Sequence, residues 1–423
     1  MSDSNIYDLV IIGGGPAGIM AGFVASQNIN NKILIIDRNK SFGRKLLLTG
    51  KGRCNITHNE VDFKKMIEYY NDSGKFLYSG FSQFGVKETL EFFNNNGLNL
   101  KVERGNRYFP EDGDSQSVVD FFEKNLKKEN VDIFRSSNVV KFIVKNKKII
   151  EIELSDDRTI VGKNYIIATG GKSYPVTGSD GFVFDLIAKM GHSIVTPSPA
   201  LVPLVCKEEW VKKLSGLSLK NVSLKIKGSK KNIFGEMLFT HFGLSGPIVL
   251  NISNEIVKLL SKGSVTVCLD LKPALNLKEL DLRLQRDFEK YSNYDFKNSL
   301  NELLPQSLIE TIIRLARIDF HKKVHQVTKE ERVRLVKILK NLEIEITGHL
   351  GFETAIVTSG GVDTKEVDQK TMKSKIIDNL YFAGEVLNID GKTGGYNLQM
   401  CWTTGYVAGK NFTNPIDKNQ KIV

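Results

Sequence analysis

Residues 7–22 constrain the fold of this 423-residue chain more than any other stretch of its sequence. Residues 9–12 form an apolar run of strand length without alternation, which is typical of a parallel strand buried on both faces. The six residues that follow read GGGPAG and contain the pattern G-x-G-x-x-G at Gly13, Gly15 and Gly18. In such a turn the first glycine permits the tight bend, the second lets a pyrophosphate approach the backbone, and the third lets a helix pack on the strand.

The residues after this turn complete the pattern of a nucleotide-binding unit. Pro16 suits the first turn of a helix, whose free N–H groups and dipole attract phosphate. A second apolar run, residues 33–36, ends at Asp37, where an acidic residue commonly holds the ribose hydroxyls. Strand, turn, helix, strand and acid in this order predict a dinucleotide site, although an ordinary βαβ unit with a glycine-rich turn is the alternative. Because Asp37 would repel a ribose 2′-phosphate, FAD or NAD fits better than NADP.

Composition and cysteine usage limit the class of protein. With 423 residues, 41% of them hydrophobic, the chain can form two or three domains. No apolar run approaches the ~20 residues of a membrane span. The N-terminus leads directly into the first strand, so we expect a cytoplasmic protein with no membrane partner. The four cysteines lack C-x-x-C or metal-ligand spacing, which predicts reduced thiols and no metal site.

The net charge of +11 allows two interpretations. A basic surface can attract nucleic acid or acidic substrates. The other interpretation is a lysine-rich surface that is simply solvated. The lysine runs at 124–128 and 145–148 have no interleaved aromatic residues, so the solvated surface is favoured and nucleic acid is not the expected partner.

The pattern of apolar and polar residues changes along the chain and predicts four segments. Residues 1–195 have the α/β character of the first segment of a nucleotide-binding domain, which residues 346–423 complete. Short alternating runs in 196–275 predict an antiparallel β domain, completed by about 325–345, and 276–324 predict a helical subdomain. A first domain that the C-terminus completes around an insertion typically encloses FAD, a longer ligand than NAD. The last helix can aim its N-terminus at the flavin ring.

Several blocks of the sequence resemble one family almost from end to end. They are VIIGGGPAG (10–18), GRKLLLTGKGRCNIT (43–57), ATGGKSYPVTGSDG (168–181), LFTHFGLSGP (238–247), TSGGV (358–362) and FAGEVLNIDGKTGGYNLQ (382–399). The chain resembles the bacterial three-domain flavoproteins known as aminoacetone-oxidase-like or NAD(P)/FAD-dependent oxidoreductases. The resemblance implies an α/β fold: a glutathione-reductase-like Rossmann FAD-binding domain in two segments, with an inserted antiparallel β domain and a small helical domain.

The resemblance also implies which residues bind FAD. The residues expected at the pyrophosphate and the adenosine ribose are Gly13, Gly15, Pro16, Ala17, Gly18 and Asp37. Those expected along the path toward the ring are Arg38, Lys45, Thr49, Gly50, Arg53, Cys54 and Asn55. Val139 is expected at the adenine, Thr169 and Gly170 beside the phosphate loop, Gly384 and Glu385 at the ribityl chain or phosphate, and Asn397, Leu398 and Gln399 at the pyrimidine edge of the flavin.

Three residues are candidates for catalysis on the substrate side. His241 lies in a glycine-flanked run and could shuttle a proton, since its ordinary pKa of ~6.5 suits that work near neutrality. Tyr174 and Tyr396 lie in glycine-flanked loops expected near the ring. The alternative for His241 is a buried histidine that braces a β turn, and the alternative for each tyrosine is packing against FAD or a domain interface.

Three functions remain open from the sequence. The first is an FAD-dependent oxidoreductase that oxidises a small amine or ketone, aminoacetone-like, by hydride transfer to the flavin. The second is a reductase of an enone-like substrate, with NAD(P)H as a transient reductant that has no Rossmann domain of its own. The third is a flavin-containing RNA-modifying or RNA-binding protein that uses the +11 charge. The first two expect a small-molecule substrate, and the oligomeric state stays open.

Overall fold

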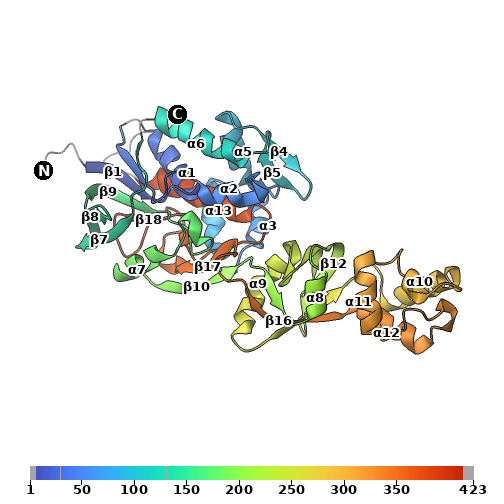
Figure 1. Cartoon of the computed structure of the whole chain (residues 1–423). Coiled ribbons are helices and arrows are strands. Elements are labelled where there is room, and N and C mark those ends of the chain that lie inside the picture. The colour runs from blue at the N-terminus through green and yellow to red at the C-terminus, as the bar shows by residue number, and fades with distance from the viewer. Residues whose placement is uncertain (1–5, 29, 130, 413–423) are drawn as a thin grey trace. The chain divides into compact units, whose positions relative to one another are not determined.

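The computed structural model describes residues 6–28, 30–129 and 131–412, which form two compact units (Figure 1). Unit 1 comprises Met1–Pro199 and Ala355–Val423, and unit 2 comprises Ala200–Thr354. The predicted segments 1–195 and 346–423 correspond to unit 1 within ten residues, although residues 1–5 and 413–423 lie outside the described residues. The predicted β and helical pieces lie together in unit 2.

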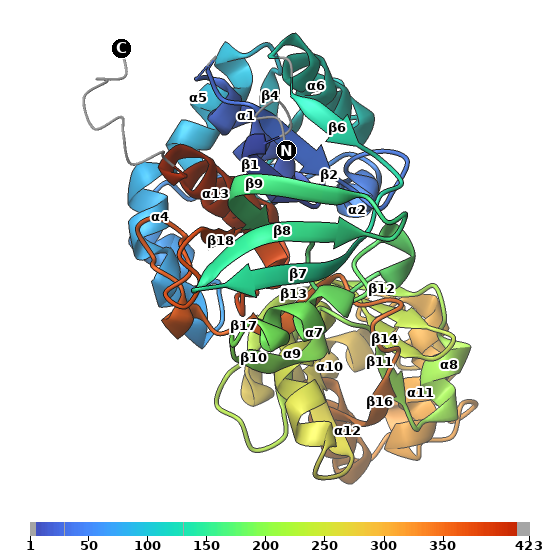
Figure 2. The same ribbon diagram turned by 90° about the vertical axis from the view of Figure 1, so that its left-hand side faces the viewer.

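A seven-stranded sheet is the centre of unit 1. Its strands are β1 (Ile6–Ile12), β2 (Ile33–Ile36), β6 (Asp132–Phe134), β7 (Val139–Lys145), β8 (Lys148–Leu154), β9 (Thr159–Ile167) and β18 (Leu380–Phe382). The order is β6-β2-β1-β9-β8-β7, and β18 also pairs with β9. β1, β2, β6, β9 and β18 pair in parallel, whereas β7, β8 and β9 form the antiparallel ribbon visible in Figure 2. The α/β Rossmann-type fold that the sequence predicts is therefore confirmed.

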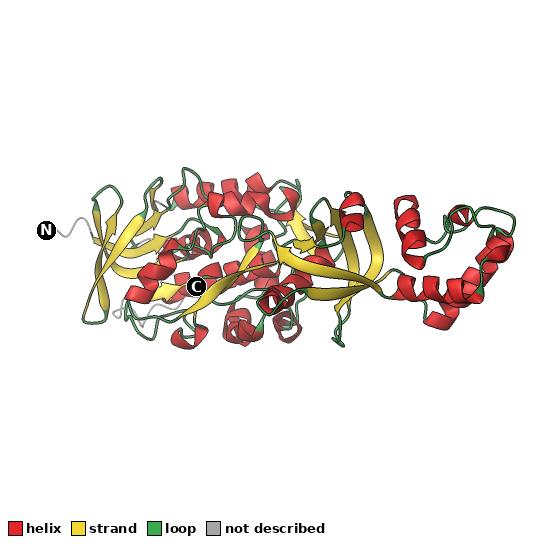
Figure 3. Cartoon of the chain, turned by 60° about the horizontal axis from the view of Figure 1, so that its bottom comes forward, coloured by secondary structure: helices red, strands yellow, loops and turns green. Residues whose placement is uncertain are grey.

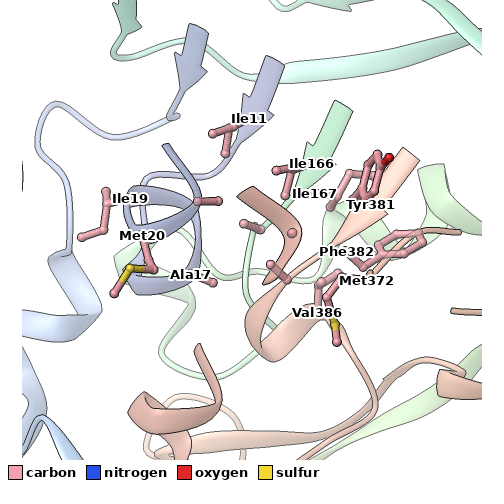
Figure 4. Close-up of a cluster of buried hydrophobic side chains, with 14 of the residues drawn as sticks. Ile11, Ala17, Ile19, Met20, Ile166, Ile167, Met372, Tyr381, Phe382 and Val386 are labelled. Atoms are coloured by element: carbon pink, nitrogen blue, oxygen red, sulfur yellow. The ribbon is translucent and has the colours of Figure 1, made fainter. Parts of the chain in front are cut away.

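The apolar strands of this sheet are buried because helices cover them. Residues 9–11 have no exposed surface, and neither do Ile166 and Ile167. Figure 4 shows side chains of β1 and β9 with those of the first helix and of the C-terminal segment: Ile11, Ala17, Ile19, Met20, Ile166, Ile167, Met372, Tyr381, Phe382 and Val386. Burial of such side chains supplies the main favourable term in folding.

Helices surround the sheet of unit 1. They are α1 (Pro16–Ser26), α2 (Arg44–Leu48), α3 (Phe63–Ile67), α4 (Tyr78–Gln83), α5 (Val86–Asn95), α6 (Ser115–Lys128), α7 (Phe182–Lys189) and α13 (Tyr396–Asn411). α1 and α13 pack very closely, because a Cβ atom at Gly405 would lie 2.3 Å from the carbonyl oxygen of Ala17, and one at Gly409 would lie 2.5 Å from that of Ala21. Only glycine fits at both positions.

Two smaller sheets complete unit 1. β3 (Thr57–His58), β5 (Arg107–Pro110) and β4 (Leu100–Glu103) form one of them, in the order β3-β5-β4. The other pairs β10 (Ile194–Ala200) with β17 (Val357–Val362), where the chain leaves unit 1 and returns to it.

Unit 2 combines a closed antiparallel barrel with helices, as the strands and helices of Figure 3 illustrate. The barrel strands are β11 (Leu204–Cys206), β12 (Ser218–Ile226), β13 (Ile233–Thr240), β14 (Gly243–Ser245), β15 (Val265–Asp270) and β16 (Leu342–His349). The helices are α8 (Glu209–Lys213), α9 (Pro247–Leu260), α10 (Leu277–Lys290), α11 (Gln306–Ala316) and α12 (Lys329–Lys340). The inserted antiparallel β structure is confirmed, and closure of the barrel, which leaves no open edge, is an additional finding.

Within the residues that the structure describes, no helix is long and apolar enough to cross a membrane.

Candidate functional site

A cavity in unit 1 brings together most of the residues predicted to bind FAD. It begins at the carboxyl ends of β1 and β2 and extends to the first turn of α13. The predicted residues that line it are Gly13, Gly15, Pro16, Ala17, Asp37, Arg38, Lys45, Thr49, Val139, Thr169, Gly170, Gly384, Glu385, Asn397 and Leu398. The carboxyl end of parallel strands is where α/β folds bind nucleotides.

The glycine turn at one end of the cavity has the geometry of a phosphate cradle. Gly13 has a φ of +108°, which a side chain would strain. A Cβ atom at Gly18 would lie 1.8 Å from the carbonyl oxygen of Gly13, so this glycine serves helix–strand packing and does not line the cavity. A Cβ atom at Gly15 would meet nothing within 4 Å, which leaves room for a phosphate at the N-terminus of α1.

Asp37 holds the glycine turn as well as facing the cavity. Its Oδ2 accepts the backbone N–H of Gly14 at 2.6 Å, and its Oδ1 accepts that of Asn39 at 2.6 Å. The side chain is buried, with 8% of the residue exposed. Burial raises the pKa of Asp37, while the two N–H donors act in the opposite direction. The ribose contact that the sequence predicts would use oxygens that already accept one hydrogen bond each.

A charged cluster, made of Lys45, Ser173, Thr358 and Glu385, lies farther along the cavity. The Nζ atom of Lys45 lies 2.8 Å from Oε2 of Glu385 and 2.5 Å from Oγ of Ser173. Oε1 of Glu385 accepts the hydroxyl of Ser173 at 2.8 Å and the backbone N–H of Thr358 at 2.7 Å. The cluster therefore joins the two chain segments of unit 1 through a partly buried ion pair.

Ser173 and Thr358 are members of this cluster that the sequence analysis missed. Each lies in a block that carries the family resemblance, next to glycine residues, and this adjacency was the available signal. Cys401 was also missed, although it lines the cavity one turn after Asn397. Burial raises the pKa of the Cys401 thiol to about 12, so the thiol is neutral near pH 7.

Five further predicted residues do not line the cavity: Gly50, Arg53, Cys54, Asn55 and Gln399. Arg53 pairs with Glu103 at 2.8 Å. Cys54 is fully buried. Gln399 is also fully buried, with its amide bonded to hydroxyls of Thr57, Thr89 and Thr403. The side chain of Gln399 is thus engaged in the interior, and its predicted contact with the flavin gains no support from this placement.

The three predicted catalytic residues lie in different surroundings. Tyr174 has a φ of +50°, and its carbonyl oxygen accepts the N–H and hydroxyl of Thr177 at the start of a short 3₁₀ helix. Tyr396 begins α13 and is buried, with 3% exposed. His241 is exposed and lies in unit 2, in the turn between β13 and β14, so it is not the buried histidine of the alternative interpretation. The catalytic roles of all three stay predictions.

The chemistry of the cavity fits FAD. The hydroxyl of Thr169 in the cavity wall is buried and has no hydrogen-bond partner among the described residues. Buried polar atoms without partners are rare unless a ligand or water completes them. Together with the open approach to Gly15, the unpaired Thr169 hydroxyl offers contacts that a dinucleotide would complete. Among residues 6–28, 30–129 and 131–412, no group of three His, Cys, Asp or Glu side chains could hold a metal ion.

Comparisons with known proteins agree with this site. A family model described as "HI0933-like protein Rossmann domain" matches residues 7–411. A 3-dehydro-bile acid delta(4,6)-reductase of Clostridium scindens is 32% identical over 404 residues, which cover 95% of this chain and 97% of that protein. A ribosomal RNA dihydrouridine synthase of Escherichia coli is 30% identical over 406 residues, which cover 96% of this chain and 98% of that protein.

One solved structure shows the same fold at low sequence identity. The 3-ketosteroid delta1-dehydrogenase of Sterolibacterium denitrificans aligns with a TM-score of 0.52 and 10% identity, covering 97% of this chain and 99% of that chain. The match to the family model spans nearly all described residues, and both curated relatives align along almost their whole length. This chain therefore belongs to the HI0933-like family of Rossmann flavoproteins, and it is an FAD-dependent oxidoreductase.

Proposed function

We propose that this enzyme reduces a ring carbon–carbon double bond that is conjugated to a carbonyl group. The observation that carries the proposal is a chemistry shared by two relatives whose names differ. Dihydrouridine is uridine with the C5=C6 bond of its uracil ring reduced, and that bond is conjugated to a carbonyl. The name of the bile acid relative describes reduction of double bonds conjugated to a 3-oxo group. This is the enone-like alternative of the sequence analysis.

The substrate that the charge favours is a uridine in ribosomal RNA. Unit 2 contains 25 lysines and arginines against 18 aspartates and glutamates, so it carries +7 of the net charge of +11. Several of its exposed lysines, such as Lys213, Lys220 and Lys262, form no ion pair within the part of the chain that the structure describes. Contacts with phosphate dominate the affinity of RNA-binding proteins. We therefore interpret the exposed lysines of unit 2 as contacts for RNA and not as a surface that is only solvated. A cytoplasmic location accords with an RNA substrate.

The reaction needs a hydride, a proton and a two-electron donor. FAD, held by the glycine turn and the other residues that line the cavity, would supply the redox chemistry that carries two electrons from a reduced nicotinamide to the substrate. The π bond of the substrate breaks, the carbon β to the carbonyl gains the hydride, and the carbon α to it gains a proton from water. NADH or NADPH is oxidised in the same cycle. The protein binds and orients the reactants.

Oxidation of an aminoacetone-like amine or ketone, which the resemblance implies, remains the other candidate. Neither curated relative described above carries such a name. An oxidase would take electrons from the amine and pass them to oxygen, whereas the proposed reductase takes them from a nicotinamide. The direction of electron flow therefore separates the two functions.

The test uses the purified, FAD-loaded enzyme without oxygen. We expect NADH or NADPH to bleach the flavin and ribosomal RNA transcribed in vitro, which holds no dihydrouridine, to restore its colour. Mass spectrometry of the digested RNA should then show uridine that has gained two hydrogens. If a 3-oxo-4,6-diene steroid restores the flavin colour and RNA does not, the substrate is a small enone and not RNA. Bleaching by aminoacetone, with no recovery on addition of RNA or steroid, would overturn the proposal.

A further inference from the structure

Three aromatic side chains stack in unit 1 beside the first turn of α13. The His58 ring lies on the Tyr396 ring with centroids 4.9 Å apart and planes 20° from parallel. The Tyr396 ring lies on that of Tyr69 at 4.4 Å and 13°. The Nζ atom of Lys392 lies 4.9 Å from the centroid of the Tyr69 ring. The His58 and Tyr69 centroids are themselves 6.1 Å apart, with planes 32° from parallel, so both rings lie beside Tyr396 and near each other. We call His58, Tyr69 and Tyr396 the aromatic stack.

The aromatic stack is held rigidly against the start of α13. The hydroxyl of Tyr70 donates to the carbonyl oxygen of Tyr396 at 2.6 Å. A Cβ atom at Gly395 would lie 2.5 Å from the carbonyl carbon of Thr57 and 2.9 Å from the nitrogen of His58, so the two backbones are in direct contact. The position of the imidazole relative to α13 is therefore fixed by backbone packing as well as by ring stacking.

None of the three rings lines the cavity, but the aromatic stack adjoins the residues at the end of it that the sequence assigns to the flavin ring. Tyr396 is followed directly by Asn397 and Leu398, both of which line the cavity. A Cβ atom at Gly394 would lie 3.7 Å from Cδ2 of His58, which places this edge of the imidazole beside the glycine-rich turn before α13. His58 thus contacts the turn that leads into the cavity-lining residues of α13, although sequence reasoning did not select it.

The two ring nitrogens of His58 differ in their surroundings. Nδ1 is buried and has no hydrogen-bond partner among the described residues. Nε2, the nitrogen next to Cδ2, forms no hydrogen bond within those residues and is not among the buried atoms. A buried N–H group without an acceptor is costly, so the proton of the neutral ring belongs on Nε2. Burial lowers the pKa of His58, while Glu60 and Arg107 act on it in opposite directions, so the ring is neutral near pH 7.

We infer that Nε2–H of His58 donates a hydrogen bond to the carbonyl oxygen of the conjugated substrate. The inference rests on the proposed function, because only a conjugated carbonyl develops charge in the required place. When hydride adds to the β carbon, the electron pair of the double bond moves toward the carbonyl oxygen. A fixed donor at that oxygen stabilises the developing negative charge. The α carbon then takes its proton from water, and the aromatic stack sets the plane of the donor.

The variant that tests this role is His58→Phe, which keeps a ring in the stack and removes the donor. Enzyme reduced with dithionite is mixed without oxygen with in-vitro-transcribed ribosomal RNA or with a 3-oxo-4,6-diene steroid, and the return of flavin absorbance is followed. With whichever substrate reoxidises the wild type, we expect the variant to be about 10²- to 10³-fold slower, the usual effect of removing one such donor. His58→Gln, which restores an N–H group, should recover part of the loss.

Two further readouts separate this role from a merely structural one. Retained FAD and the rate of reduction by nicotinamide should not change in His58→Phe, and substrate binding to the oxidised protein, followed by the flavin difference spectrum, should weaken less than the reoxidation rate falls. His325→Phe, an exposed histidine of unit 2, serves as the matched control. If His58→Phe does not fold, His58→Leu carries the same test.

The possible results separate a failure of the role inferred for His58 from a failure of the proposed reductase function. A His58→Phe enzyme that reoxidises at the wild-type rate would overturn the role of His58 and leave the reductase intact. A wild-type enzyme that neither substrate reoxidises would overturn the proposed function, and the role of His58 with it. A rate that falls only as far as FAD content falls would show that His58 supports the fold and nothing more.

Discussion

The two ends of the cavity are built in different ways. At the glycine end, residues 13–18 and Asp37 are close in sequence, and backbone hydrogen bonds define the turn, such as that from Gly13 N–H to the carbonyl of Ile36 at 2.8 Å. At the other end, the charged cluster joins Lys45 to Glu385 across 340 positions of sequence. FAD binding at the glycine end therefore depends on the small volume of its residues. The stability of the other end depends on the pairing of opposite charges.

The largest effect should come from adding volume at the glycine end. Gly15→Val should abolish FAD binding, by more than about a thousandfold, because the new side chain would fill the open space at the N-terminus of α1 where phosphate approaches. Thermal unfolding of the cofactor-free protein should change little, since nothing lies within 4 Å of the new Cβ atom. Flavin content after reconstitution measures the effect. Normal flavin content would contradict the idea that volume controls this end.

The next effect concerns charge at the other end. Glu385→Ala should lower the free energy of unfolding by about 3 kcal/mol, because it leaves the partly buried ammonium group of Lys45 without its counter-ion. Urea unfolding of the cofactor-free protein measures this loss. The double variant Lys45→Met/Glu385→Leu should recover most of it, since no charge then remains unpaired. If the double variant is as unstable as the single one, the cluster contributes to stability through the shape of its side chains and not through their charges.

A smaller, pH-dependent effect tests whether charge also matters at the glycine end. Burial raises the pKa of Asp37 in the folded state, so its contribution to stability is complete below the ordinary aspartate pKa of ~3.9 and is lost as pH rises through the raised value. The stability of the cofactor-free wild type relative to Asp37→Asn should therefore fall as pH rises through this range. Urea unfolding at several pH values measures it, and a constant difference would place the pKa of Asp37 at its ordinary value.

The smallest effect is expected from an exposed ion pair beside the glycine end. Arg38 pairs with Asp180, and their side chains are 40% and 38% exposed. Arg38→Ala should cost at most about 1 kcal/mol of folding free energy, because solvent screens such pairs. Comparing its urea midpoint with that of Glu385→Ala sharpens the contrast between exposed and partly buried pairs. Equal losses from the two variants would remove that contrast.

Local sequence patterns were sufficient for the elements but not for every contact. The apolar runs before Gly13 and Asp37 predict β1 and β2, because parallel buried strands require such runs. Gln399 shows where this reasoning ends: its amide pairs with hydroxyls from β3, α5 and α13, a combination that only the tertiary fold brings together. Closure of the barrel in unit 2 depends likewise on pairing of β11 with β16, which are distant in sequence.

The contact between α1 and α13 also sets the order in which this protein can fold during synthesis. About 370 residues separate Ser26 from Tyr396, and ribosomes add ~5–20 residues per second, so α1 waits roughly 20–70 s for its partner. Unit 2 is one continuous stretch that ends at Thr354, so its chain is complete while that of unit 1 is not. The newborn chain thus completes its second unit first, and the apolar surface of α1 near Ala17 and Ala21 needs protection until the last helix emerges.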